Sequence, residues 1–166
     1  SNNTSHEVTD EVMEKIVFYL SSLSPPKRRK VSDKDVLYGK KIFYESKCTS
    51  CHTPKYVTSK NAKHDFLKYQ LIWPYTDLLL HDMGDELADF DIKGNITNKE
   101  WKTPPLWGIG YAKEVNSRAT FLHDGRANTL LEAVLWHSGE AKNSIDFLLK
   151  NYKDDLNKLV IFLKSL

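Results

Sequence analysis

The stretch KCTSCHTPKY, residues 47–56, holds both cysteines of the 166-residue chain, and a histidine follows the second cysteine directly. Two cysteines at this spacing are typical of a redox-active dithiol, of half a zinc site or of a covalent haem. In the c-type haem motif Cys-x-x-Cys-His, both thiols bond to the haem vinyl groups and the histidine ligates the iron. The pattern therefore predicts one haem c, held by Cys48, Cys51 and His52.

The sequence around this motif disfavours the two alternatives. A thioredoxin-like pair begins a helix that follows a buried strand, whereas residues 35–47, DVLYGKKIFYESK, have the pattern of an amphipathic helix. A zinc finger needs two further ligands at suitable spacing. His64 lies at a tolerable distance, but the residue four positions later is Lys68. A structural, zinc-binding module stays the alternative to the haem interpretation.

Composition and charge narrow the class of protein further. The chain is 40% hydrophobic and 28% charged, which is typical of one ordinary globular domain. Its net charge is only +2, so we expect no nucleic-acid partner. The longest apolar run, residues 159–163, is too short to cross a bilayer, and we expect no transmembrane segment. Covalent haem attachment takes place outside the bacterial cytoplasm, so we expect a periplasmic protein whose signal sequence is not in this chain.

Apolar periodicity predicts a mainly α-helical, cytochrome c-like fold of four or five helices. The first helix spans residues 10–23 and ends at SPPKRRK, where we expect an exposed basic linker. A Ser32-x-x-Asp35 capping pattern starts the second helix, which runs to Glu45. We expect its Gly39 and Phe43 to pack against a last helix over residues 144–166, and a small β-hairpin to pair residues 56–57 with residues 70–72.

A haem iron bound by His52 has a sixth coordination position, for which the chain offers two candidates. A Thr129-x-x-Glu132 capping box and Gly139 predict a short helix over residues 129–138, in which His137 continues the apolar stripe. A buried imidazole needs partners for its nitrogens, and a haem iron can be one. The rival is Met83, which precedes Gly84 at the start of a loop, although methionine often only fills a core.

Four blocks of the sequence resemble a known family, the bacterial di-haem oxidoreductases, whose members are often labelled thiol oxidoreductases or peroxidases. The more distant resemblance is to di-haem cytochrome c peroxidases and MauG-type enzymes. The resemblance runs from about residue 33 to residue 166. The blocks are CTSCHTPKY (48–56), PYTDLLLHDMGDELAD (74–89), EWKTPPLWGIG (100–110) and FLHDGRANTLLEAVLWHSGEA (121–141).

The resemblance implies a division of the chain into domains and a pair of ligands for the haem iron. Members have two haem domains in tandem, so residues 31–166 would be the C-terminal haem domain. Residues 1–30 would be a helix and basic linker that trail from a missing N-terminal domain. His137 aligns with the distal ligand position, which favours bis-histidine ligation by His52 and His137. The resemblance also implies a haem-pocket wall, for which the candidates are Pro104, Leu106 and Trp107, with Trp101 and Ile109.

One position departs from the family pattern. Trp107 stands where the peroxidases have an arginine, so Arg118 or Arg126 would have to meet a haem propionate instead.

With both axial positions filled, we expect one six-coordinate haem that relays electrons within a di-haem oxidoreductase or peroxidase-like protein. Its partner would be the N-terminal haem domain, which would hold the catalytic haem, or another periplasmic redox protein. The alternative is a stand-alone, peroxidase-like haem enzyme in which the sixth ligand dissociates.

Overall fold

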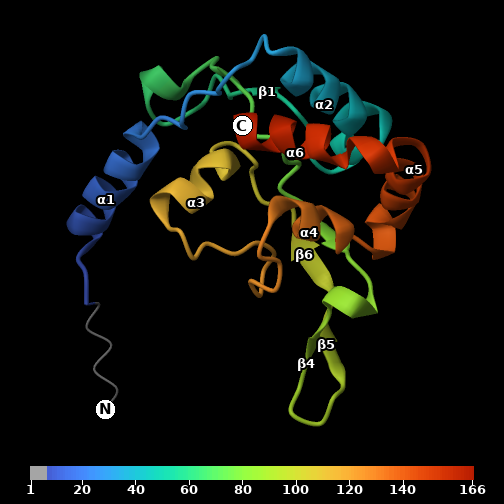
Figure 1. Ribbon diagram of the computed structural model, residues 1–166. Helices are drawn as coiled ribbons and strands as arrows, with labels where there is room; N and C mark the ends of the chain where they lie inside the picture. The colour runs from blue at the N-terminus through green and yellow to red at the C-terminus, as the bar shows by residue number, and fades with distance from the viewer. Residues whose placement is uncertain (1–6) are drawn as a thin grey trace.

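The structure is a computed structural model that describes residues 7–166, and helices dominate it (Figure 1). The mainly α-helical prediction, with a small β-hairpin, is confirmed. The helices are α1 (Asp10–Ser22), α2 (Lys34–Glu45), α3 (Ala112–Val115), α4 (Leu130–Leu135), α5 (Lys142–Tyr152) and α6 (Leu156–Ser165). The strands are β1 (Tyr56–Val57), β2 (Leu71–Ile72), β3 (Leu80–Asp82), β4 (Asp89–Phe90), β5 (Ile96–Asn98) and β6 (Glu100–Lys102).

Helix α2 begins one residue later than its predicted capping pattern. The N-cap is Asp33 rather than Ser32, and its carboxylate accepts hydrogen bonds from the backbone N–H groups of Asp35 and Val36. Aspartate is as good an N-cap as serine, and its negative charge favours the helix N-terminus. The predicted end at Glu45 is confirmed.

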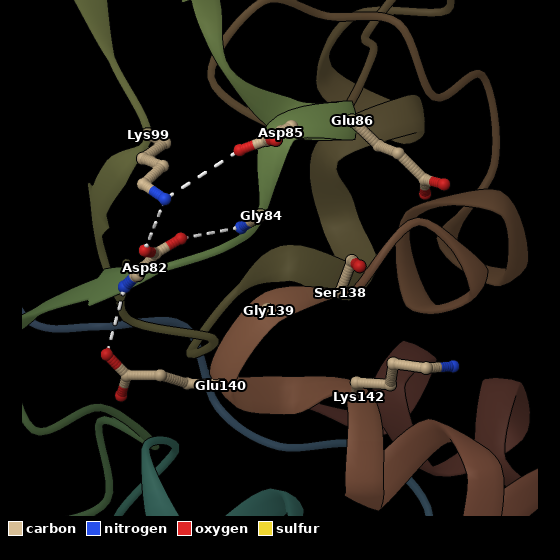
Figure 2. Close-up of a pocket in the computed structure, with 9 residues that line it drawn as sticks. All are labelled: Asp82, Gly84, Asp85, Glu86, Lys99, Ser138, Gly139, Glu140 and Lys142. Atoms are coloured by element: carbon tan, nitrogen blue, oxygen red, sulfur yellow. Dashed lines mark hydrogen bonds and ion pairs between the residues drawn. The ribbon is translucent and has the colours of Figure 1, made fainter.

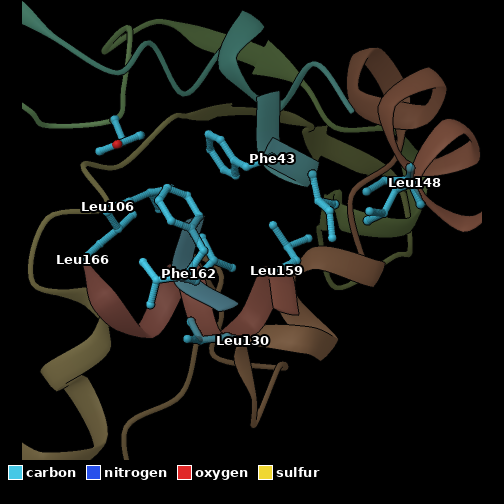
Figure 3. Packing of buried hydrophobic residues seen from close by; sticks show 12 residues of the cluster. Phe43, Leu106, Leu130, Leu148, Leu159, Phe162 and Leu166 are labelled. Atoms are coloured by element: carbon cyan, nitrogen blue, oxygen red, sulfur yellow. The ribbon is translucent and has the colours of Figure 1, made fainter. Parts of the chain in front are cut away.

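The crossing of α2 and α6 forms the centre of the fold, as predicted from Gly39 and Phe43. A Cβ atom placed on Gly39 would lie 1.9 Å from the carbonyl oxygen of Lys158, so only glycine allows the two helices to approach this closely. One turn later, the ring of Phe43 lies 5.3 Å from that of Phe162. Leu106, Leu130, Leu148, Leu159 and Leu166 pack around this pair (Figure 3). The crossing fixes the end of α2, from which the cysteine motif follows.

Three short antiparallel strand pairs complete the domain. The predicted hairpin is confirmed, with Tyr56 opposite Ile72 in an antiparallel pair. The other two strand pairs were not predicted. Strand β3 pairs with β6, and between them β4 and β5 form a hairpin that projects away from the helices (Figure 1). The β3–β6 pair carries His81 opposite Trp101 and so lies next to the candidate site described below.

The last helix differs from its prediction. Instead of one helix over residues 144–166, the chain forms α5, a 3-10 turn over Lys153–Asp155, and α6. Tyr152 leaves the helical conformation with φ −136° and ψ 22°. The break lets Leu148 of α5 and Leu159 of α6 reach the same core, where both are fully buried. A single straight helix would turn one of these faces away.

The basic linker is less exposed than predicted. Arg29 donates hydrogen bonds of 2.8 Å to the carbonyl oxygens of both Gly110 and Lys164. The guanidinium of Arg28 lies 5.7 Å from the centre of the Phe162 ring. Both arginines therefore fasten the segment after α1 to the domain, although every residue of α1 up to Leu20 is exposed. The proposed division between residues 1–30 and 31–166 stays a prediction, and residues 1–6 lie outside the described part.

No helix within residues 7–166 is both long and apolar enough to span a membrane.

Candidate haem site

The cysteine motif forms a tight turn directly after α2. Lys47 has a φ of 58°, and a 3-10 helix over Cys48–Ser50 follows it. The backbone N–H of His52 donates a 2.9 Å hydrogen bond to the carbonyl of Cys48. Both cysteines are free thiols. Burial raises the pKa of the Cys48 thiol to about 12, and burial also raises the pKa of Cys51. Redox-active dithiols instead have a lowered thiol pKa, so the turn does not have the properties of a thioredoxin-like pair.

His52 points into the aromatic core. Its Nδ1 lies 3.0 Å from the carbonyl oxygen of Tyr75, and because that oxygen only accepts, Nδ1 carries the proton. The His52 ring also lies 6.1 Å from Phe43. Burial lowers the pKa of His52 to about 4, so the imidazole is neutral near pH 7. A neutral imidazole whose Nδ1–H is bonded to a carbonyl leaves Nε2 as a free lone pair, the form that binds a metal.

The imidazole of His137 has the same kind of surroundings as that of His52. It follows the end of α4, which stops at Leu135 and is therefore shorter than the predicted helix over residues 129–138. Thr129 caps α4 as predicted, accepting from the backbone N–H of Glu132 at 3.1 Å. The Nδ1 of His137 lies 2.7 Å from the carbonyl oxygen of Ala133, which again leaves Nε2 free. Burial lowers the pKa of His137, so this imidazole is also neutral.

The two imidazoles lie at a distance from each other that suits a shared metal ion. Their ring centres are 6.3 Å apart, with 47° between the ring planes. Metal–imidazole bonds are about 2 Å long, so two rings bound to one ion from opposite sides have centres about 6 Å apart. His52 and His137 therefore fit an iron ion between them, beside the two thiols of the attachment turn.

Met83, the rival ligand, lies against the segment that follows His137. Its backbone N–H donates a 3.0 Å hydrogen bond to the carbonyl of Lys99. A Cβ on Gly139 would lie 2.7 Å from its carbonyl carbon. The structure thus brings Met83 near the same side of the site, while the ring that it places opposite His52 is that of His137.

The predicted wall residues differ in their surroundings. Leu106 is buried in the core beside Phe43, whereas Pro104 and Trp107 are exposed. Trp101 stacks on His123 at 3.6 Å between ring centres. Their role as a haem-pocket wall stays a prediction. Of the two arginines considered for a haem propionate, Arg126 forms a 2.5 Å ion pair with a neighbour, Asp124.

A hydrogen-bonded group that the sequence analysis missed joins the two histidine segments; we call its residues, Asp77, His81 and Glu140, the clasp. His81 bonds to Asp77 through Nε2 at 2.8 Å and to Glu140 through Nδ1 at 2.9 Å. Asp77 lies two residues after Tyr75, the partner of His52, and Glu140 lies three residues after His137. The hint in the sequence is that all three residues occur within family-like blocks, Asp77 and His81 in residues 74–89 and Glu140 in residues 121–141.

Gly139 allows the segment that carries Glu140, one residue of the clasp, to approach β3 closely. Its φ is 55°, and a Cβ there would lie 2.2 Å from the carbonyl oxygen of Asp82. Glu140 also accepts a 3.1 Å hydrogen bond from the backbone N–H of Asp82. A cleft of about 650 Å³ adjoins this contact and is lined by both strand and loop residues, as Figure 2 shows. The segment after His137 thus packs directly on the backbone at the end of β3 and the residues that follow it.

The structure also bears on the zinc interpretation. Ligand atoms of Cys51, Asp77 and His81 all lie within 4.8 Å of one another. However, both ring nitrogens of His81 are bonded to carboxylates. Because a carboxylate accepts, both nitrogens carry protons, and an imidazolium has no lone pair for a metal. The hydrogen bond with Glu140, and then that with Asp77, raises the pKa of His81. His64, the other zinc candidate, stacks on Phe66.

Comparison with known proteins identifies the family. The family model described as "Di-haem oxidoreductase, putative peroxidase" matches residues 1–166. No curated protein and no solved structure matches the chain. The family description implies a haem cofactor and redox chemistry. With a match over its whole length and a pair of neutral histidines beside a Cys-x-x-Cys-His turn, this chain belongs to the di-haem oxidoreductase family.

Proposed function

We propose that this chain is a c-type cytochrome domain that relays electrons within a di-haem oxidoreductase. Cys48 and Cys51 would attach one haem covalently, and His52 and His137 would bind its iron. The observation that carries the proposal is the 6.3 Å separation of the two rings, each with its Nδ1 held by a backbone carbonyl. The bound haem supplies a one-electron redox centre.

Two backbone carbonyls orient the histidines that would hold this centre. The carbonyls of Tyr75 and Ala133 fix the tautomer and direction of the two imidazoles, which increases the basicity of Nε2 in each. With two imidazole ligands and no thioether, we expect a lower reduction potential than for a histidine–methionine pair. The partner is a second haem domain of the same protein or another periplasmic redox protein, and covalent attachment places the chain in the periplasm.

The test is the optical and low-temperature EPR spectrum of the ferric, haem-loaded protein. We expect a low-spin bis-histidine signal that is lost in His137→Ala and kept in the matched variant Met83→Leu. A thioether-to-iron charge-transfer band that survives in His137→Ala and disappears in Met83→Leu would assign the sixth ligand to Met83 and contradict the proposal.

A second candidate function is a stand-alone, peroxidase-like enzyme from which the sixth ligand departs. It is favoured by the position of His137 beyond the end of α4, a helix of only 6 residues. Peroxide turnover by the isolated wild-type chain, together with a high-spin ferric signal, would support this function over the relay.

A further inference from the structure

Trp73 offers a route from the surface to the proposed iron ligand. Its indole follows β2 and is 36% exposed. Two residues later comes Tyr75, whose ring lies 6.5 Å from that of Trp73. Pro74 and Tyr75 are both buried, so the segment between the indole and the site lies inside the protein.

The route continues through bonded atoms to the site. The carbonyl oxygen of Tyr75 accepts the 3.0 Å hydrogen bond from Nδ1 of His52. From the indole to the imidazole, the path therefore consists of the backbone of Trp73, Pro74 and Tyr75 and a single hydrogen bond. Among the exposed tryptophans, Trp73 is linked to His52 in this way within the described residues. Trp136 directly precedes the other proposed ligand, His137, but the cation over its ring, that of Arg126, is ion-paired with Asp124.

Two lysines place positive charge on this exposed indole. The Nζ atoms of Lys55 and Lys40 lie 5.6 Å and 5.9 Å from the centre of the Trp73 ring. They come from different parts of the chain, since Lys40 is on α2 and Lys55 follows the cysteine motif. In the described part of the chain, neither ammonium forms a salt bridge with a carboxylate, unlike their neighbour Lys41. Their charge is thus available to a partner from outside.

We propose that Trp73, Lys40 and Lys55 form the docking surface for an acidic one-electron carrier protein, with Trp73 as the contact through which the electron passes. This inference rests on the proposed relay function and names its partner class and point of contact. The reduced carrier loses one electron, the ferric haem iron gains it, and no bond forms or breaks. Charge complementarity steers the carrier to the patch and accelerates the encounter at low salt.

The kinetic test uses two small oxidants of opposite charge on the ferrous, haem-loaded protein: hexacyanoferrate(III), an anion, and tris(phenanthroline)cobalt(III), a cation. Lys40→Glu/Lys55→Glu should slow the anionic reagent about tenfold at low salt and accelerate the cationic one. The control Lys150→Glu/Lys153→Glu makes the same change in net charge at two exposed lysines elsewhere. Trp73→Leu should slow both reagents. Equal rates in the patch variant and the control, or no effect of Trp73→Leu, would overturn the proposal.

A binding measurement tests the surface without electron transfer. In an NMR titration of the ferrous protein with an acidic flavodoxin, the amides of Lys40 and Lys55 and the Trp73 indole N–H should shift. The shifts should vanish in the patch variant and at about 1 M salt, where the Debye length is about 3 Å. Shifts confined to other surfaces would overturn the proposal. A low-spin bis-histidine spectrum in every variant shows that the ligand pair is intact, and its absence in the wild type would refute the relay function itself.

Discussion

The two histidines of the proposed haem site lie close together, but the protein holds them by different means. His52 follows the motif turn at the end of α2, next to the apolar core. Phe43 and Tyr75, which contact it, are 3% and 0% exposed and pack on Phe162. The segment of His52 is therefore held by burial, which at about 25 cal/mol per Å² of apolar surface is the stronger kind of restraint.

The segment of His137 is anchored in the core by Leu130 of α4, but beyond the end of that helix polar contacts hold it instead. It lies past the short helix α4, and its neighbours are the clasp and the backbone contact of Gly139 with Asp82. Solvent screens the contacts of an exposed carboxylate such as Glu140, so they restrain the segment less than burial does. The comparison teaches that the site has one fixed side and one side that can yield. If one of the two proposed iron ligands dissociates, we expect it to be His137.

The largest expected effect is on the fixed side. Gly39→Ala forces a Cβ to within 1.9 Å of the Lys158 carbonyl oxygen, so α2 and α6 must separate. We expect a loss of about 3 kcal/mol in the free energy of unfolding, measured by urea titration and far-UV circular dichroism. The control is Gly94→Ala, where a Cβ meets no atom within 4 Å and only the φ of 82° is unfavourable. It should lose about 1 kcal/mol. Equal losses would contradict the packing argument.

On the yielding side, Gly139→Ala should separate ligation from folding. The new Cβ would clash with the Asp82 carbonyl oxygen, and a φ of 55° is strained for alanine. We expect a loss of about 2 kcal/mol and, in the haem-loaded protein, a partial change from low-spin to high-spin iron. Gly39→Ala should keep its low-spin spectrum until it unfolds. A high-spin fraction that is larger in Gly39→Ala would reverse the comparison.

The clasp should make the His137 side sensitive to pH. The hydrogen bond with Glu140 raises the pKa of His81, so its contribution is complete at low pH and is lost as pH rises through the raised value. The hydrogen bond with His81 lowers the pKa of Glu140, so that contribution is lost as pH falls through the lowered value. Desolvation alone would raise the pKa of Asp77, but the Leu79 N–H and His81 together lower it.

The clasp is therefore strongest in mildly acidic solution. Glu140→Gln should destabilise the protein more at about pH 5.5 than at about pH 9, because His81 is protonated to a greater extent at the lower pH. Urea titrations at both pH values measure the difference. The control Asp146→Asn, which removes a surface carboxylate 3.1 Å from Lys142, should show no such change between the two pH values. A larger effect of Glu140→Gln at about pH 9 would contradict the assigned charge state of His81.

The smallest expected effect lies outside both regions, in α1. Phe18 is half exposed, and its ring lies 5.1 Å from His64 and 6.2 Å from Phe66. Phe18→Ala should change the free energy of unfolding by less than about 1 kcal/mol, while hydrogen exchange in α1 accelerates. A loss as large as that of Gly39→Ala would show that α1 belongs to the core.

Local patterns in the sequence were enough for much of the fold. The Cys-x-x-Cys-His turn, the shared face of Gly39 and Phe43 and the β1–β2 pair each depend on residues close in the chain or on one repeating spacing. Those predictions that the structure tests directly, the helix crossing and the hairpin, are confirmed. Predictions failed where tertiary packing decides the outcome. The break at Lys153–Asp155 and the packing of Arg28 and Arg29 each depend on segments distant in the chain.

The sequence by itself determined which groups are available for chemistry: two thiols, the adjoining His52, and His137 as a candidate on the apolar stripe of a short helix. Only the tertiary structure decided how those groups meet. It placed the rings of His52 and His137 6.3 Å apart, and it joined Asp77, His81 and Glu140 into a clasp between their segments. The physical reason is range: a helical spacing is set by neighbours along the chain, whereas these distances are set by the packing of segments far apart in sequence.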